Sequence, residues 1–264
     1  MPATTWIAGD KTQLDSPGQI YVAPSGSLYT CNFHDQRILG FAPNARGDVA
    51  PIRSISGSNN PVNACDGVAV YAGRVAAVGF QPPKNRVVAW SEDSNGNVAP
   101  TRLIFGPATK LDSPSDVAFD TSGNLYVTNS DSNTITVYAP SADGDAAPMR
   151  MIDGSLTGLS RPHALAIDET SQLIYIANGA QEIIAYKLSQ GGNVKPTVTI
   201  DGAKTGLDYP SGVAVDAAGY IYVMNYPNTG GPFLTVYAPG SNGDVAPVQT
   251  IKGKVGMGGR IAVK

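Results

Sequence analysis

The stretch Gly47-Asp48-Val49-Ala50-Pro51, together with the β-like run that follows it to Gly57, recurs along the chain. Each copy has a Gly-Asp or Gly-Asn turn, then a proline, then a short run that ends in glycine or just before one. The prolines of successive copies lie 49, 48, 48 and 51 residues apart, at Pro51, Pro100, Pro148, Pro196 and Pro247. A period of about 50 residues over nearly the whole chain indicates a repeat fold.

Each repeat contains four short strand-like runs, and the third repeat shows them most clearly. Its expected strands are 116–120, 124–128, 134–138 and 148–152, all rich in Val, Ile, Tyr, Phe and Thr and bounded by turn residues. A tight turn at 121–123 joins the first two strands as a hairpin. No window has a helical period. Units of four antiparallel strands at this spacing predict an all-β fold, a β-propeller in which each repeat is one blade.

The proline of each repeat is consistent with this architecture, because proline cannot donate to a strand ladder and belongs on an edge strand. We expect one β-propeller domain over 1–264. Its repeats lie at approximately 10–57, 58–106, 107–154, 155–202 and 203–253. Residues 3–9 copy a fourth strand and residues 260–263 copy a first strand. We therefore expect five full blades, with these extra terminal strands reinforcing the seam. The alternative is a ring of six blades with one incomplete.

Composition excludes some classes of function. Lys and Arg number 18 against 21 Asp and Glu, without a basic cluster, so we expect no nucleic-acid partner. The longest apolar runs, such as 75–78, are too short to span a membrane. Residues 1–10 do not resemble a signal peptide. The charge-poor, Thr-, Ser-, Asn- and Gly-rich composition favours an extracellular or periplasmic monomer whose signal peptide has been removed.

Two motifs carry a resemblance to known propeller families. Residues 124–129, Asn-Leu-Tyr-Val-Thr-Asn, resemble the signature of the Tyr-Val-Thr-Asn (YVTN) repeats. The pattern Pro-Ser-Gly-Val-Ala-Val-Asp at 210–216, with Gly-Tyr-Ile-Tyr-Val at 219–223, is similar to NHL repeats. The resemblance covers residues 3–263, and the second repeat is the most divergent. It implies a β-propeller, and such propellers include binding modules, surface-layer or adhesion modules, lyases and lactone hydrolases.

Propeller ligands generally bind over the central channel, on the face with the loops into the first strand and out of the second. We call this face the channel mouth. When the repeats are aligned, three kinds of residue fall at the channel mouth. They are the last residues of four second strands, polar residues at the start of first strands, and an aromatic residue. The predicted ligand-binding residues are Asn32, Asp66, Asp116, Asn129, His163, Asn178, Asn225, Tyr226 and Arg260. The alternative for the asparagines is that they cap strand ends and satisfy loop backbone.

These residues suit two kinds of function. The first is a non-enzymatic binding module that takes a small polar molecule, a glycan or a protein over the channel face. The second is a metal-assisted lyase or lactone hydrolase, with Ca²⁺ or Mg²⁺ on the carboxylate and amide oxygens and His163 as general base. Only two histidines are present, which excludes a three-histidine zinc site. Because the sequence has no recognisable catalytic constellation, we favour the binding module over an enzyme.

The two cysteines are placed for pairing in the predicted propeller. Cys31 ends the second strand of the first repeat, and Cys65 replaces the proline before the first strand of the second repeat. Both positions lie on the same face of neighbouring blades, so we predict a Cys31–Cys65 disulfide, with two buried free thiols as the alternative. A disulfide indicates an oxidising compartment.

Overall fold

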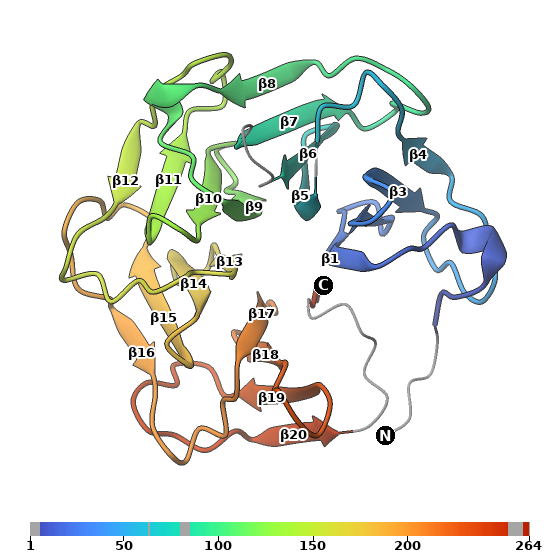
Figure 1. The fold of residues 1–264 in the computed structure, drawn as a ribbon. Coiled ribbons are helices and arrows are strands. Elements are labelled where there is room, and N and C mark those ends of the chain that lie inside the picture. The colour runs from blue at the N-terminus through green and yellow to red at the C-terminus, as the bar shows by residue number, and fades with distance from the viewer. Residues whose placement is uncertain (1–5, 63, 80–84, 253–260, 264) are drawn as a thin grey trace.

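The computed structural model describes residues 6–62, 64–79, 85–252 and 261–263, which form five antiparallel sheets of four strands each. The sheets follow one another around a ring as the blades of a β-propeller (Figure 1). In every sheet the strands are hydrogen-bonded in chain order, from an innermost first strand to an outermost fourth strand. The expected all-β propeller with five full blades is confirmed.

The strands have equivalent places in all blades. The first, innermost strands are β1 (Pro17–Val22), β5 (Cys65–Tyr71), β9 (Pro114–Phe119), β13 (Ala164–Asp168) and β17 (Pro210–Val215). The second strands are β2 (Leu28–Asn32), β6 (Arg74–Gly79), β10 (Leu125–Asn129), β14 (Leu173–Asn178) and β18 (Ile221–Asn225). The third strands are β3 (Arg37–Phe41), β7 (Arg86–Ser91), β11 (Thr134–Tyr138), β15 (Glu182–Lys187) and β19 (Phe233–Tyr237). The outer strands are β4 (Arg53–Ile55), β8 (Arg102–Phe105), β12 (Arg150–Ile152), β16 (Val198–Ile200) and β20 (Gln249–Lys252).

Burial explains why the middle strands are the most apolar. Every residue of β10 and β11 is buried, because neighbouring blades cover both faces of the middle of a blade. β-Branched and aromatic side chains suit such a strand. The outer strand β12 is shorter than predicted and begins at Arg150, two positions after Pro148. The proline therefore precedes the edge strand and costs it no ladder hydrogen bond.

Apolar side chains pack between consecutive blades. Four buried clusters occupy the junctions between blades one and two, two and three, three and four, and four and five. The largest buried side chains, Trp90, Tyr138, Tyr186 and Tyr237, lie at or near the ends of the third strands of four blades. The hydroxyl of Tyr138 donates to the carbonyl oxygen of Thr109 in the preceding interblade connection, so this aromatic ring also anchors the connection.

The repeated Gly-Asp or Gly-Asn turn joins one blade to the next. Ile55 at the end of β4 forms a parallel bridge with Gly96 in the following repeat. One residue further, the side-chain oxygen of Asn97 accepts a hydrogen bond from the amide of Asn59 at 2.8 Å. The equivalent side-chain bonds in the other repeats are Lys11–Asp48, Ala108–Asp145, Leu156–Asn193 and Lys204–Asp244. We call this contact the interblade clasp.

The terminal segments depart from the prediction of extra strands. Of the predicted strand 3–9, the structure describes residues 6–9, in which Ile7 alone forms a parallel bridge, to Gly47. Residues 261–263 of the predicted strand 260–263 line the channel beside the first strands without forming a ladder. The described residues include two short 3₁₀ helices: Asp10–Thr12 lies in the N-terminal segment before β1, and Pro107–Thr109 lies in the connection between blades two and three.

Candidate functional site

Most side chains along the wall of the central channel are apolar. A hollow of about 190 Å³ is bounded by first strands of four blades and by the C-terminal segment. Its lining is Gln19–Val22, Val117–Phe119, Leu165–Ile167, Val213–Val215 and Ile261–Val263, in which Gln19 and Tyr21 are the polar side chains. In the described part of the channel, polar side chains are therefore concentrated near its mouth, where the first strands begin.

The four asparagines that end second strands are fully buried. The side-chain oxygens of Asn129, Asn178 and Asn225 each accept a backbone amide at 2.8–3.0 Å from the loop that leads into the first strand of the same blade. Asn32 donates through Nδ2 to the carbonyl oxygen of Gln13 at 2.6 Å. In all four blades, then, the asparagine amide group fixes the loop at the channel mouth.

Asn178 also contacts an acid beside the mouth. Its Nδ2 donates to Oε1 of Glu182 at 2.6 Å. Burial raises the pKa of Glu182, and the hydrogen bond from Asn178 opposes that rise. The asparagine thus supports the charged form of a half-buried carboxylate at the start of β15.

Asp116 connects the first strands of two blades. Its carboxylate is fully buried and accepts the amide of Val117 at 2.7 Å and the amide of Leu165, in the next blade, at 2.9 Å. Gln19 makes the equivalent contact between blades one and two, where its Oε1 accepts the amide of Val68 at 2.6 Å. Sequence reasoning did not single out Gln19, because its link to the next blade depends on the tertiary packing of β1 against β5.

Asp66 and His163 are half-buried where the first strands of blades two and four begin. Together with Asp116 they place three titratable side chains on three consecutive blades around the mouth. The backbone amide of His163 donates to the carbonyl oxygen of Ala177 at 2.9 Å, which fixes the loop that carries the imidazole. Within the described ranges, no group of three or more His, Cys, Asp or Glu side chains is arranged to hold a metal ion. Arg260 lies outside the described residues.

Blade five presents two tyrosines at the mouth. Tyr209 is 47% exposed and Tyr226 is 45% exposed, and the amide of Tyr226 donates to the carbonyl oxygen of Tyr209 at 2.9 Å. Tyr209 has a φ of +52°, a left-handed conformation that a bulky side chain rarely adopts. The other blades have Ser16, Ala64, Ser113 and Arg161 at this position, also with positive φ. Tyrosine at this position is therefore a departure from the repeat at an exposed, strained site.

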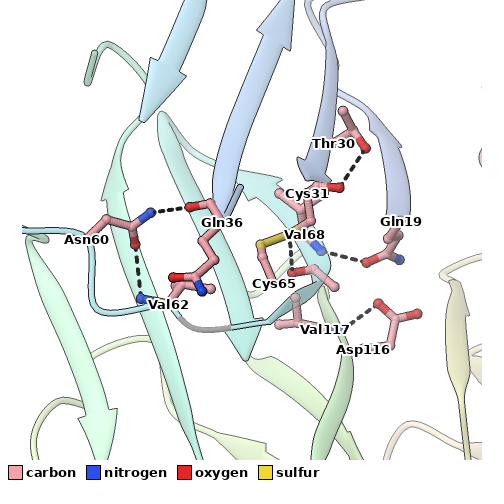
Figure 2. Close-up of a disulfide and its surroundings, with 11 residues drawn as sticks. Gln19, Thr30, Cys31, Gln36, Asn60, Val62, Cys65, Val68, Asp116 and Val117 are labelled. Carbon is pink, nitrogen blue, oxygen red and sulfur yellow. Dashed lines mark hydrogen bonds between the residues drawn. A yellow bond between two sulfur atoms is a disulfide. The ribbon is translucent and has the colours of Figure 1, made fainter. Parts of the chain in front are cut away.

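Figure 2 shows the disulfide between Cys31 and Cys65, which links blade one to blade two. Both side chains are fully buried, and their Cα atoms are 5.4 Å apart. The hydrogen bond from Val68 to Gln19 lies beside it in the same view. The covalent bond and the Gln19 contact together hold the first junction of the ring close to the mouth.

These features define the class: a β-propeller of five four-stranded blades with a mouth of buried amides, scattered carboxylates and exposed tyrosines. Residues 111–138, which include β9, β10 and β11, match the NHL repeat family model. The chain is a five-bladed β-propeller in which residues 111–138 match an NHL repeat.

Among solved structures, the chain is similar to a chain in the crystal structure of a nidogen/laminin complex, with a TM-score of 0.59 and 13% sequence identity. The alignment covers 84% of this chain and 80% of that chain, and at this identity it shows the fold alone. No curated protein matches the sequence. Within the described residues, no helix has the length and apolar character needed to cross a membrane.

Proposed function

We propose that this propeller is an extracytoplasmic binding module that takes its partner at the channel mouth, over blade five. The observation that carries the proposal is the pair Tyr209 and Tyr226. Two exposed aromatic rings lie on adjacent loops, and one of them occupies a backbone conformation that disfavours its side chain. A strained residue at an exposed position is typical of a binding site, where function offsets the cost in stability.

The chemistry of the surroundings favours a partner with both polar and apolar parts. A tyrosine ring stacks on sugar rings or apolar side chains, while its hydroxyl group forms hydrogen bonds. Asp66 and His163 supply polar groups around the same mouth. The Cys31–Cys65 disulfide supports an oxidising compartment for this encounter, since disulfides persist mainly outside the cytosol.

The experiment compares the native protein with a double variant, Tyr209→Ser with Tyr226→Ser, on an oligosaccharide array and in a selection from a displayed peptide library. Serine is the residue that blades one and three have in place of Tyr209, so the variant keeps a side chain that the repeat already accepts. We expect ligands that the native protein retains and that the double variant binds about tenfold more weakly or worse. Ligands bound equally by both proteins would contradict the proposal.

A matched control is Tyr220→Ser, at an exposed tyrosine in the turn between β17 and β18, at the opposite end of the blade. This variant should bind as the native protein does. Loss of binding in the control as well would mean that the tyrosines act through general stability rather than through contact with the ligand.

A further inference from the structure

The sector of the ring between blade five and blade one differs from the other four junctions. Apolar clusters of buried side chains fill the junctions from blade one through blade five. The first strands of those neighbouring blades contact each other in turn, but β17 and β1 do not pack together in this way. We call the region between blade five and blade one the open sector.

Blade one has uncovered apolar side chains on the flank that faces the open sector. Ile20 is 37% exposed, whereas the residues at the same ladder position of the other first strands are at most 4% exposed: Val68, Val117, Leu165 and Val213. Leu28 is half-buried, whereas its equivalents Val75, Leu125, Ile174 and Ile221 are buried. Comparison with the equivalent residues of the other blades thus shows that, within the described residues, Ile20 and Leu28 lack the neighbouring blade that buries their equivalents.

Blade five shows the same departure on its facing flank. Leu234 and Ile251, which are paired across β19 and β20, are both half-buried. The equivalent pairs in the four other blades are buried: Ile38 with Ile55, Val87 with Ile104, Ile135 with Ile152, and Ile183 with Ile200. Among the described residues, apolar side chains on both sides of the sector therefore lack the cover that their equivalents have.

The inner and outer positions of the sector are already taken by described residues of this chain. Residues 261–263 lie at the channel beside the first strands, in the place of an innermost strand. Ile7 bridges Gly47 as Ile55 bridges Gly96, in the place of the end of an outer strand. A blade has two middle strands between these positions.

The backbone of Ile7 has an edge ready for one of those strands. The amide of Gly47 donates to the carbonyl oxygen of Trp6, and the amide of Ala8 donates to the carbonyl oxygen of Gly47. The amide and carbonyl of Ile7, which lies between Trp6 and Ala8, therefore point away from Gly47. Ile55 uses the same edge to pair with Ile38 in the third strand of its blade. In the part of the chain that the structure describes, Ile7 has no such strand beside it. An open hollow of about 700 Å³, with Ile7, Leu14 and Phe33 in its lining, adjoins this edge.

We propose that the open sector accepts a two-stranded β-hairpin from a partner protein, which completes a sixth blade in trans. The hairpin is apolar on both faces, because the middle strands of a blade are buried on both: β10 and β11 are buried along their whole length. It adds backbone hydrogen bonds at the edge of Ile7 and covers Ile20, Leu28, Leu234 and Ile251. The residues of this site are different from the tyrosine pair of the proposed function.

The test uses the middle hairpin of blade three, supplied as a fluorescein-labelled peptide with the sequence of residues 124–138, which includes β10 and β11. Its binding to the full chain is followed by fluorescence anisotropy and by the thermal unfolding temperature. We expect saturable binding that raises the unfolding temperature, since a ligand that binds only the folded state stabilises it. Absence of saturable binding overturns the proposal.

Variants locate the binding. Ile20→Lys and Leu234→Lys, on opposite flanks, should each weaken binding about tenfold or more, because a lysine ammonium would be buried under the hairpin. Met149→Lys, at an exposed position of blade three, is the matched control and should leave binding unchanged. If Leu234→Lys does not fold, as judged by circular dichroism, Ile251→Ser replaces it. Equal binding by all variants overturns the proposal.

Two further measurements distinguish the open sector from the tyrosine pair and from self-association of the propeller. The double variant Tyr209→Ser with Tyr226→Ser should bind the hairpin as tightly as the native protein does. Loss of hairpin binding in this double variant would overturn the proposal that the hairpin binds at a different site from the tyrosine pair. Sedimentation velocity over a concentration series should show a monomer for the native protein. A dimer of the native protein that is lost in Ile20→Lys is not expected. Such a dimer would place a second copy of this chain in the open sector and overturn the partner hairpin.

Discussion

The backbone amide of Lys11 donates a hydrogen bond of 2.7 Å to Oδ1 of Asp48, 37 positions further along the chain. The same clasp holds each interblade connection to the following blade, but here it holds the N-terminal segment to blade one. The segment therefore contacts blade one as every other connection contacts the blade after it. It continues the pattern of the ring beyond its five complete blades.

The clasp predicts a defined pattern of stabilities. Asp48→Ala should lower the free energy of unfolding by about 1 kcal/mol, because the amide of Lys11 loses its acceptor at an exposed site. Asp48→Asn should retain most of the stability, since Asn97 and Asn193 serve as acceptors in other repeats. Urea unfolding of the two variants checks this. Equal losses in both would show that the negative charge, rather than the accepted hydrogen bond, is what matters.

The glycine that precedes each clasp is required by space as well as by conformation. Gly106 has a φ of +124°, and a Cβ there would lie 2.4 Å from Oδ1 of Asp145. Gly106→Ala should therefore cost about 2–4 kcal/mol in unfolding free energy, from strain and displacement of the clasp. Gly158→Asn is the comparison, since Gly158 also has positive φ but has open space around a Cβ, and asparagine tolerates this conformation. A chemical denaturation series in which both variants lose the same stability would contradict the steric argument.

Asp116 should be important for stability irrespective of any ligand. Asp116→Ala leaves the amide of Leu165 in the next blade without this acceptor, at a buried position, and should cost about 2–3 kcal/mol. Asp116→Gln should recover part of this, because Gln19 makes the same contact between blades one and two. Guanidinium unfolding measures both. A glutamine variant no more stable than the alanine variant would argue against this account of the link.

The disulfide should contribute substantially to the stability of the ring. Cys31 and Cys65 are separated by 34 residues, and chain entropy predicts about 4 kcal/mol for closing such a loop. The double variant Cys31→Ala with Cys65→Ala should unfold at lower urea concentration and should no longer respond to a reducing agent. Native protein under reducing conditions should approach the variant. Two reactive thiols in the unfolded, unreduced native protein would contradict the bond.

Asp216 gives a prediction about acid. Burial by itself raises the pKa of Asp216, but hydrogen bonds from the amides of Tyr220 and Ala218 and from the Tyr222 hydroxyl outweigh it and hold the pKa below its usual value of 3.8. A lowered folded pKa stabilises the fold above the unfolded pKa, and this stabilisation is lost as the pH falls through the folded pKa. The free energy of unfolding is measured from pH 6 downwards. Below about pH 4 it should fall less steeply in Asp216→Asn than in the native protein. Parallel profiles would contradict this role.

Strand content and blade number follow from local sequence. The proline tag and the alternation of β-forming runs with turn residues are local signals, and four strands per period leave few other architectures. The structure differs mainly at the outer strand, which begins at Arg150 rather than at Pro148. That difference reflects a property of proline, which cannot join the ladder it precedes.

The channel mouth was less predictable. Sequence alignment places the asparagines at the ends of second strands, and the structure has them there, but their amide groups bond the loops of their own blades. The register shifts where β1, β5, β9 and β17 pair with the second strands. A bulge of this kind redirects the side chains around it, so the direction in which Asp116 points could not be read from its position.

The sequence by itself determines that this chain forms five similar blades, because the interactions that define a strand or a turn involve residues near one another in the chain. Only the tertiary structure decides how the ring closes. Blade packing turns Gln19 and Asp116 toward their neighbours, and it leaves Ile20 and Leu234 on the two sides of an open sector. Those outcomes depend on contacts between residues on different blades, which no local pattern specifies.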